Sequence, residues 1–133
     1  MKTEKIKMEI TLPETPEKIY KAWLNSKSHS AFTGAKAKIQ EKVNSNYSAW
    51  AGYITGKITA LEENKKIVHA WRTSEFPADA KDSKLEISLK EVKGGTKLTL
   101  IQTDIPKGDK KKYTDGWHEF YFIPMKKYFT GNK

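Results

Sequence analysis

The chain lacks cysteine and has one arginine and three histidines among its 133 residues. Without cysteine there are no disulfides, no thiol nucleophiles and no thiolate metal ligands. His29, His69 and His118 do not form an HxH or HxxxH pair, so no metal site is predicted. Motifs of the GxSxG type and glycine-rich phosphate loops are missing as well. We therefore expect no cofactor and no catalytic residues, in a protein that is not an enzyme.

One group of residues leaves an enzymatic alternative open. Asp115, His118 and Glu119 lie close together at the expected start of the last helix, where a general acid or base is conceivable. Acidic residues in the first turn of a helix are ordinary capping chemistry, however. We interpret this group as capping.

Long apolar runs are also missing. No segment is long enough to span a bilayer, and Met1–Lys5 leads directly into a strand pattern without the apolar core of a signal peptide. We expect a cytoplasmic protein without membrane insertion. Because 37% of the residues are hydrophobic and no linker or repeat is visible, residues 1–133 are predicted to form a single domain.

The net charge of +9 comes almost entirely from lysine. Specific recognition of bases and phosphates favours the planar guanidinium of arginine, so a specific nucleic-acid partner is not expected. A basic surface instead favours an acidic protein partner through electrostatic steering. The one run of three lysines is interpreted as a solvated loop that steers such a partner. The candidate partner-binding residues are Lys110, Lys111, Lys112 and Arg72.

Alternation of apolar and polar residues predicts an antiparallel sheet. The glycines at positions 52 and 56 indicate bends or bulges, as a strongly curved sheet requires. Lys93-Gly94-Gly95 predicts a hairpin turn. The predicted strands are residues 6–12, 36–42, 47–61 as one bent strand or two, 67–74, 84–90 and 96–103.

Two short helices are expected after the first strand. Thr15 is a typical N-cap, Pro16 suits the first helical position, and Glu17 complements the positive end of the helix dipole. The second of these helices is predicted over residues 27–33. Together with the strands, they indicate an α+β fold.

The last helix, predicted over residues 116–129, is the most aromatic segment of the chain. At helical spacing its apolar residues form one stripe, which needs a large concave surface to lie on. Pro124 predicts a kink. We therefore expect a curved sheet of about six strands wrapped around this helix. The stripe consists of Trp117, Phe120, Tyr121, Pro124 and Tyr128.

Several short motifs follow one another along nearly the whole chain. They are Thr15–Trp23, Ala31-Phe32-Thr33, Gly52–Ile58, Ile67–Arg72, Phe76-Pro77, Ile105-Pro106, Gly116-Trp117 and Phe120-Tyr121-Phe122. In this order they resemble the activator of heat-shock protein 90 ATPase (Aha-type) domain family of the START-like helix-grip superfamily.

This resemblance implies a helix-grip fold and a non-catalytic, co-chaperone-like protein. The implied partner is a heat-shock protein 90 family chaperone or another acidic protein, and stimulation of the chaperone's ATPase is a further activity that the resemblance suggests. The co-chaperones of the family carry a separate N-terminal domain that this sequence does not show, so the expectation concerns binding and not full ATPase activation.

An alternative is the binding or carriage of a small hydrophobic molecule between the sheet and the last helix, as in many helix-grip proteins. The aromatic residues either fill the core or line such a cavity, and their bulk predicts that any cavity is small. The cavity candidates are Trp23, Phe32, Trp50, Tyr53, Trp71, Phe76, Trp117, Phe120, Tyr121 and Met125.

Overall fold

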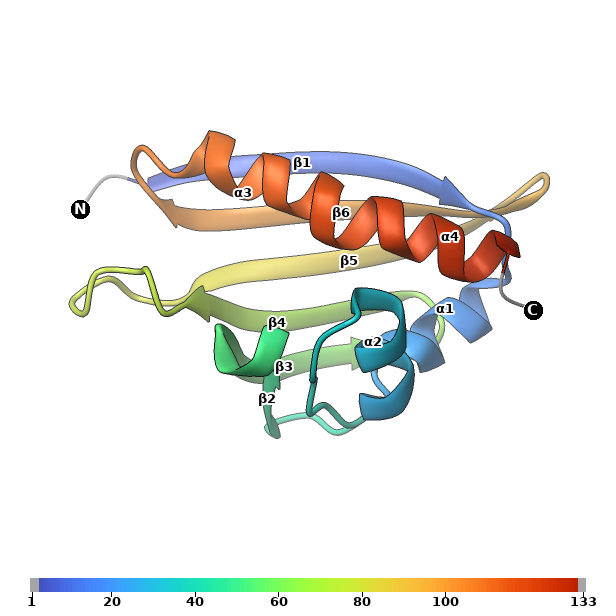
Figure 1. The fold of residues 1–133 in the computed structure, drawn as a ribbon, viewed down its shortest axis with the longest axis horizontal. Helices are drawn as coiled ribbons and strands as arrows, with labels where there is room; N and C mark the ends of the chain where they lie inside the picture. The colour runs from blue at the N-terminus through green and yellow to red at the C-terminus, as the bar shows by residue number, and fades with distance from the viewer. Residues whose placement is uncertain (1–2, 132–133) are drawn as a thin grey trace.

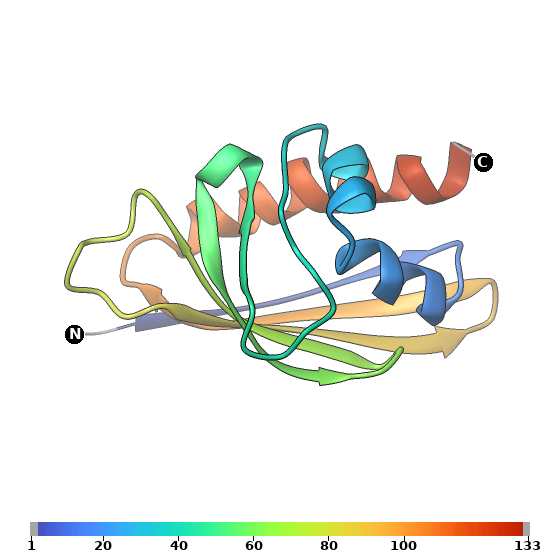
Figure 2. The same cartoon turned by 90° about the horizontal axis from the view of Figure 1, so that it is seen from below.

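A six-stranded antiparallel sheet carries the described helices on one of its faces (Figure 1, Figure 2). The structure is a computed structural model that describes residues 3–131. In the spatial order of the sheet, the strands are β1 (Thr3–Leu12), β6 (Gly95–Pro106), β5 (Ser83–Val92), β4 (Lys66–Thr73), β3 (Ile54–Glu62) and β2 (Asn46–Ala49). The helices are α1 (Pro16–Trp23), α2 (Ser26–Thr33), α3 (Lys110–Trp117) and α4 (Ile123–Gly131).

The side of the sheet that faces the helices is apolar because alternate residues of each strand point towards it. Leu85, Ile87 and Leu89 of β5 are buried, and Ile87 and Leu89 pair with the buried Leu100 and Leu98 of β6. Figure 2 shows α1, α2 and the C-terminal helical segment on this side of the sheet. The predicted α+β helix-grip fold is confirmed.

The two short helices begin where capping side chains are available. Thr15 Oγ1 accepts a hydrogen bond from the backbone N–H of Lys18 at 3.3 Å, and Asn25 Oδ1 accepts from Ser28 at 3.0 Å. Gly34, with φ 80°, ends α2 in the left-handed conformation that glycine adopts without strain. Both predicted helices are confirmed.

The strand predicted over residues 36–42 is wrong. Apart from an isolated bridge to β2, this segment has no partner strand. Ala37 and Ile39 are buried, which explains the alternation in the sequence. Their backbone N–H groups donate to the hydroxyls of Ser30 (2.8 Å) and Ser26 (2.9 Å), so side chains of α2 replace a strand ladder.

Residues 47–61 form two strands and not one. Between β2 and β3 lies a short helical turn, η1 (Trp50–Gly52), in which φ is positive at all three residues. The ladder between β3 and β4 also shifts register between Ile58 and Ala60, which marks a bulge. The predicted bends are therefore present, although a tryptophan and an alanine make most of the turn.

The last helix begins at Lys110, six residues before the predicted start at Gly116. Its first turn is capped by Glu4 of β1, whose carboxylate oxygen accepts from the N–H groups of Gly108 (3.0 Å) and Lys110 (3.1 Å). The lysine run therefore belongs to a helix and not to a loop. The residues interpreted as capping lie in the middle of the helical segment: Asp115, His118 and Glu119.

A π-helical turn, η2 (His118–Phe122), joins α3 to α4. The kink predicted at Pro124 is wrong: α4 runs through the proline, the irregular turn precedes it, and Figure 1 shows α3, η2 and α4 as one continuous rod. Side chains at every fourth position are buried along this rod. In a regular α-helix such a row would rotate by about 40° at each step, whereas the wider π turn keeps it facing the sheet. The row is Tyr113, Trp117, Tyr121, Met125 and Phe129.

The predicted apolar stripe is therefore partly wrong. Trp117 and Tyr121 are buried, but the side chain of Phe120 is 51% exposed, and Pro124 and Tyr128 are half-buried. The α-helical spacing used for the prediction does not hold across η2.

Candidate functional site

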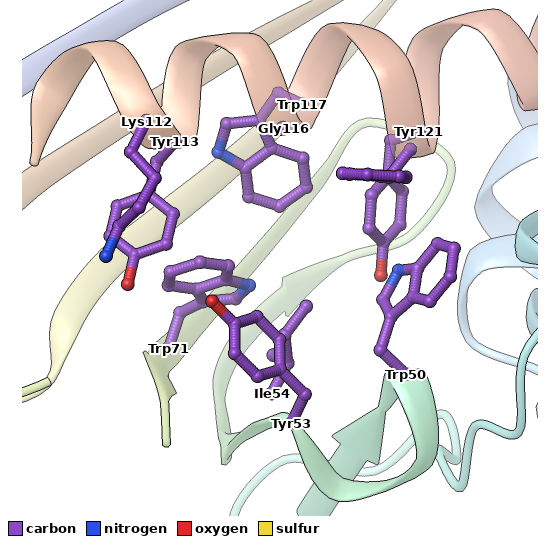
Figure 3. A pocket seen from close by; sticks show the side chains of 10 residues that line it. Trp50, Tyr53, Ile54, Trp71, Lys112, Tyr113, Gly116, Trp117 and Tyr121 are labelled. Atoms are coloured by element: carbon purple, nitrogen blue, oxygen red, sulfur yellow. The ribbon is translucent and has the colours of Figure 1, made fainter. Parts of the chain in front are cut away.

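A cavity of about 350 Å³ opens between η1, the adjoining ends of β3 and β4, and the C-terminal helical segment. Figure 3 shows that aromatic rings from both sides point into it. Seven of the ten lining residues are aromatic, and one carries a charge. They are Trp50, Tyr53, Ile54, Trp71, Lys112, Tyr113, Gly116, Trp117, Phe120 and Tyr121.

Buried hydrogen bonds hold the helical wall of this cavity against the sheet. The indole N–H of Trp117 donates to Gln102 Oε1 at 2.8 Å, and Gln102 Nε2 donates to Ser83 Oγ at 2.9 Å. Ser83 in turn donates to the carbonyl of Trp71, a second wall residue, at 2.6 Å. Since Gln102 and Ser83 are buried, this series of hydrogen bonds fixes Trp117 and Trp71 relative to one another.

A neutral, buried histidine accepts a hydrogen bond from the hydroxyl of Tyr121. Burial lowers the pKa of His29 to about 4, so its ring carries one proton at neutral pH. The ring atom Nδ1 lies 2.8 Å from the carbonyl of Trp23, which can only accept, and therefore holds that proton. Nε2 is then an acceptor for the hydroxyl of Tyr121 at 2.9 Å. The Tyr121 oxygen keeps acceptor capacity, and Figure 3 shows it turned towards the indole of Trp50.

A second neutral histidine lies on the other side of Trp23. The indole N–H of Trp23 donates to Nε2 of His69 at 3.4 Å. Burial lowers the pKa of His69 to about 3. The interior next to the cavity is therefore uncharged at neutral pH.

The charged groups of the site gather at one end of its opening. The hydroxyl of Tyr53 donates to Glu75, and the ammonium of Lys112 lies 3.3 Å from the same carboxylate and 3.8 Å from Asp109. These hydrogen bonds hold the pKa of Glu75 below its usual range. Partial burial and the bond to Glu75 raise the pKa of Tyr53 to about 12. Lys112 also lies 4.9 Å from the ring centre of Tyr113.

The structure brings together six of the ten cavity candidates: Trp50, Tyr53, Trp71, Trp117, Phe120 and Tyr121. The other four do not line the cavity. Trp23 and Phe32 pack against His29, Phe76 lies under the guanidinium of Arg72, and Met125 is buried in the core. Sequence reasoning missed Ile54, Tyr113 and Gly116, which became identifiable only with the true start of the last helix and the position of η1.

The candidate partner-binding residues are largely engaged within the protein. Lys111 pairs with Asp115 at 2.8 Å, and Lys112 pairs with carboxylates as described above. The guanidinium of Arg72 donates to Asp82 and to the carbonyls of Pro77 and Ala80, so it holds the loop before β5. Lys110 is exposed.

The part of the chain from residue 3 to residue 131 contains no group of three or more histidine, aspartate or glutamate side chains able to hold a metal ion. It also contains no helix long and apolar enough to cross a membrane.

The fold is shared with solved structures. An HSP90 activator from Plasmodium falciparum matches with a TM-score of 0.79 and 23% identity, over 91% of each chain. The Aha1 dimer from Colwellia psychrerythraea matches with a TM-score of 0.81 and 17% identity, over 98% of this chain and 99% of that one. At these identities the likeness establishes the fold alone.

Sequence comparison reaches the same group of proteins. The human Activator of 90 kDa heat shock protein ATPase homolog 1 is 26% identical over 127 residues, which are 96% of this chain and 37% of the human protein. The Dictyostelium discoideum activator homolog is 27% identical over 117 residues, or 87% of this chain and 30% of that protein. The family profile for Activator of Hsp90 ATPase homolog 1-like protein matches residues 13–130. The chain therefore belongs to the family of Activator of Hsp90 ATPase homolog 1-like proteins.

Proposed function

We propose that this protein is a non-catalytic, co-chaperone-like module that binds a heat-shock protein 90 chaperone in the cytoplasm. The observation that carries this proposal is the family match over residues 13–130, together with the fold of a solved HSP90 activator. No cofactor is needed for such a role. Residues 1–133 would act as one domain.

Charge supports an acidic partner. The net charge of +9 raises the rate of encounter with an acidic surface, and this steering weakens as salt screens it. The screening length falls from about 30 Å at 0.01 M to about 8 Å at 0.15 M ionic strength. Binding to the chaperone should therefore be sensitive to salt.

The direct test is a titration of the ¹⁵N-labelled protein with the heat-shock protein 90 homologue of its own source. We expect shifts confined to one face, and an affinity at 0.02 M salt about ten-fold or more above that at 0.15 M, because steering dominates at low salt. Hen lysozyme, another basic protein, serves as a control for unspecific attraction to the chaperone. An unchanged spectrum at low salt would contradict the proposal.

ATPase stimulation is a separate part of this proposal. The chain spans about 37% of the length of its human relative, so binding and stimulation need separate measurements. Adding the protein to the chaperone and following phosphate release tests the second activity once binding is established.

A second candidate function is the binding of a small hydrophobic molecule. The specific observation in its favour is the aromatic cavity of about 350 Å³, close to the lower end of the range of ligand pockets. A titration with 2-naphthol, followed through the indole N–H signals, tests it. We expect shifts at Trp50, Trp71 and Trp117 and not at Trp23, which lies outside the cavity. Equal shifts at all four would contradict a specific site.

A further inference from the structure

The opening of the aromatic cavity carries two of the four exposed large apolar side chains of the described residues. Among residues 3–131, four large apolar side chains are exposed by more than a third: Val43, Tyr53, Phe120 and Ile123. Tyr53 and Phe120 line the cavity, and Ile123 follows Phe120 by about one turn of the same helical rod. Grouped apolar side chains on a basic, lysine-rich surface indicate an interaction site more than isolated ones do.

The turn that forms one edge of this opening is strained. Trp50 and Ala51 have φ values of 53° and 55°, a conformation that costs a non-glycine residue about 1–2 kcal/mol. Hydrogen bonds from Ala51 N–H to the carbonyl of Lys36 (2.9 Å) and from Tyr53 N–H to that of Trp50 (3.1 Å) hold it in place. The turn sets the indole of Trp50 edge-on to Phe120, with ring centres 5.4 Å apart. Backbone strain of this kind clusters at binding sites.

A lysine lies at each of the two ends of the opening. Figure 3 shows Lys112 and Trp50 at opposite ends of the cavity. Lys36 is exposed and adjoins the turn at the Trp50 end through its hydrogen bond with Ala51. At the Lys112 end the ammonium is shared with Glu75 and Asp109, so Lys36 is the cation open to an acidic residue beside an inserted side chain.

We propose that this opening is the anchoring site for a large apolar side chain presented by an acidic segment of a protein partner. The proposal rests on the proposed function and names the surface through which the chaperone is bound. A cavity of about 350 Å³ walled by rings accommodates one such side chain. At protein interfaces, the few residues that supply most of the binding energy insert into well-packed, desolvated pockets.

Gly116 allows the cavity to be filled from within. It lines the cavity, and a Cβ atom added there would meet Phe120 at 3.9 Å and nothing closer. The variant Gly116→Leu should therefore keep the fold while it occupies the cavity. Gly116→Ala is the matched control, since it makes the same backbone change and adds one methyl group. Thermal melts of both should lie at or above that of the unmodified protein, because glycine is unfavourable in a helix.

The experiment measures the affinity of these variants for the heat-shock protein 90 homologue. We expect Gly116→Leu to weaken binding at least ten-fold and Gly116→Ala to change it less than two-fold. A second pair of variants tests the flanking charge. Lys36→Glu with Lys112→Glu should weaken binding about ten-fold, whereas Lys126→Glu with Lys127→Glu, at exposed sites on α4, should weaken it less than three-fold. Each pair lowers the net charge from +9 to +5, so overall charge is matched.

The outcomes separate this proposal from the proposed function. If the unmodified protein binds and Gly116→Leu binds equally well, the cavity is not the anchoring site, while the chaperone interaction stands. If the unmodified protein does not bind at all, the proposed function fails and the anchoring proposal fails with it. Binding of 2-naphthol that Gly116→Leu abolishes, without any binding of the chaperone, would assign the cavity to a small molecule instead.

Discussion

Acidification from pH 7 to pH 4 should lower the free energy of unfolding by about 3 kcal/mol through His29 alone and by a similar amount through His69. Burial lowers the pKa of these side chains to about 4 and about 3, whereas both titrate near 6.5 when the chain is unfolded. Between these values the unfolded state binds protons that the folded state does not, so stability falls as the pH falls. The loss begins near pH 6.5 and, for His29, is nearly complete at pH 4.

Urea unfolding at several pH values measures this effect. Domains of this size are stable by about 5–15 kcal/mol, so the loss is a large part of the total. The variant His29→Gln should be less stable at pH 7, because its bonds to Trp23 and Tyr121 are weakened, and should lose less stability towards pH 4. His118→Gln, at an exposed position, should keep the slope of the unmodified protein. Identical slopes in all three proteins would contradict the assignment to buried neutral histidines.

The parts of the fold that sequence predicts well are those whose hydrogen-bond partners are local or repetitive. The alternating strands β5 and β6 and the helix capped by Thr15 lie within a few residues of their predicted bounds. The segment 36–42 alternates in the same way, but the backbone N–H groups of its buried residues, Ala37 and Ile39, donate to the hydroxyls of Ser30 and Ser26. Periodicity reports burial, and it does not reveal which groups complete the backbone hydrogen bonds.

The start of the last helix also depends on a hydrogen-bond partner that local sequence patterns do not reveal, because that partner is distant in the sequence. Glu4, more than a hundred residues away, caps its first turn, whereas the N-cap residue Asp109 makes no side-chain capping hydrogen bond. The π turn changes the spacing of the buried side chains, which leaves Phe120 on the surface, and the earlier start of the helix adds Tyr113 to the buried row. Neither feature has a local sequence pattern.

The sequence indicates that aromatic residues form the candidate site, but it does not indicate which of them line the cavity. The aromatic residues were recognised, and six of them meet at one cavity. Which ones do so depends on the left-handed turn at Trp50 and Ala51, two residue types that do not ordinarily adopt positive φ. The support from His29 was missed because a single histidine in a polar stretch looks like a surface residue until its partners are known.

Replacing Gly56 by alanine should lower the free energy of unfolding by about 4 kcal/mol. Few single substitutions have so large an effect. The sequence suggests that Gly56 permits a bend, but the structure gives a different reason for it. An added Cβ would lie 1.9 Å from the carbonyl oxygen of Ala70 on β4 and 2.8 Å from the ring of Tyr47 on β2. Neither neighbour is free to move, because the hydroxyl of Tyr47 donates to that same carbonyl at 2.7 Å, across β3.

Gly116→Ala is the matched control for this substitution, since its added methyl group meets no close neighbour and should stabilise the helix by up to about 1 kcal/mol. Urea unfolding of both variants gives the comparison. Because η1 and the cavity edge follow from the path of β2 and β3, Gly56→Ala should also shift the indole N–H signal of Trp50. A loss of less than 1 kcal/mol would mean that β3 and β4 move apart without penalty, and the close strand approach would then not be what requires glycine at this position.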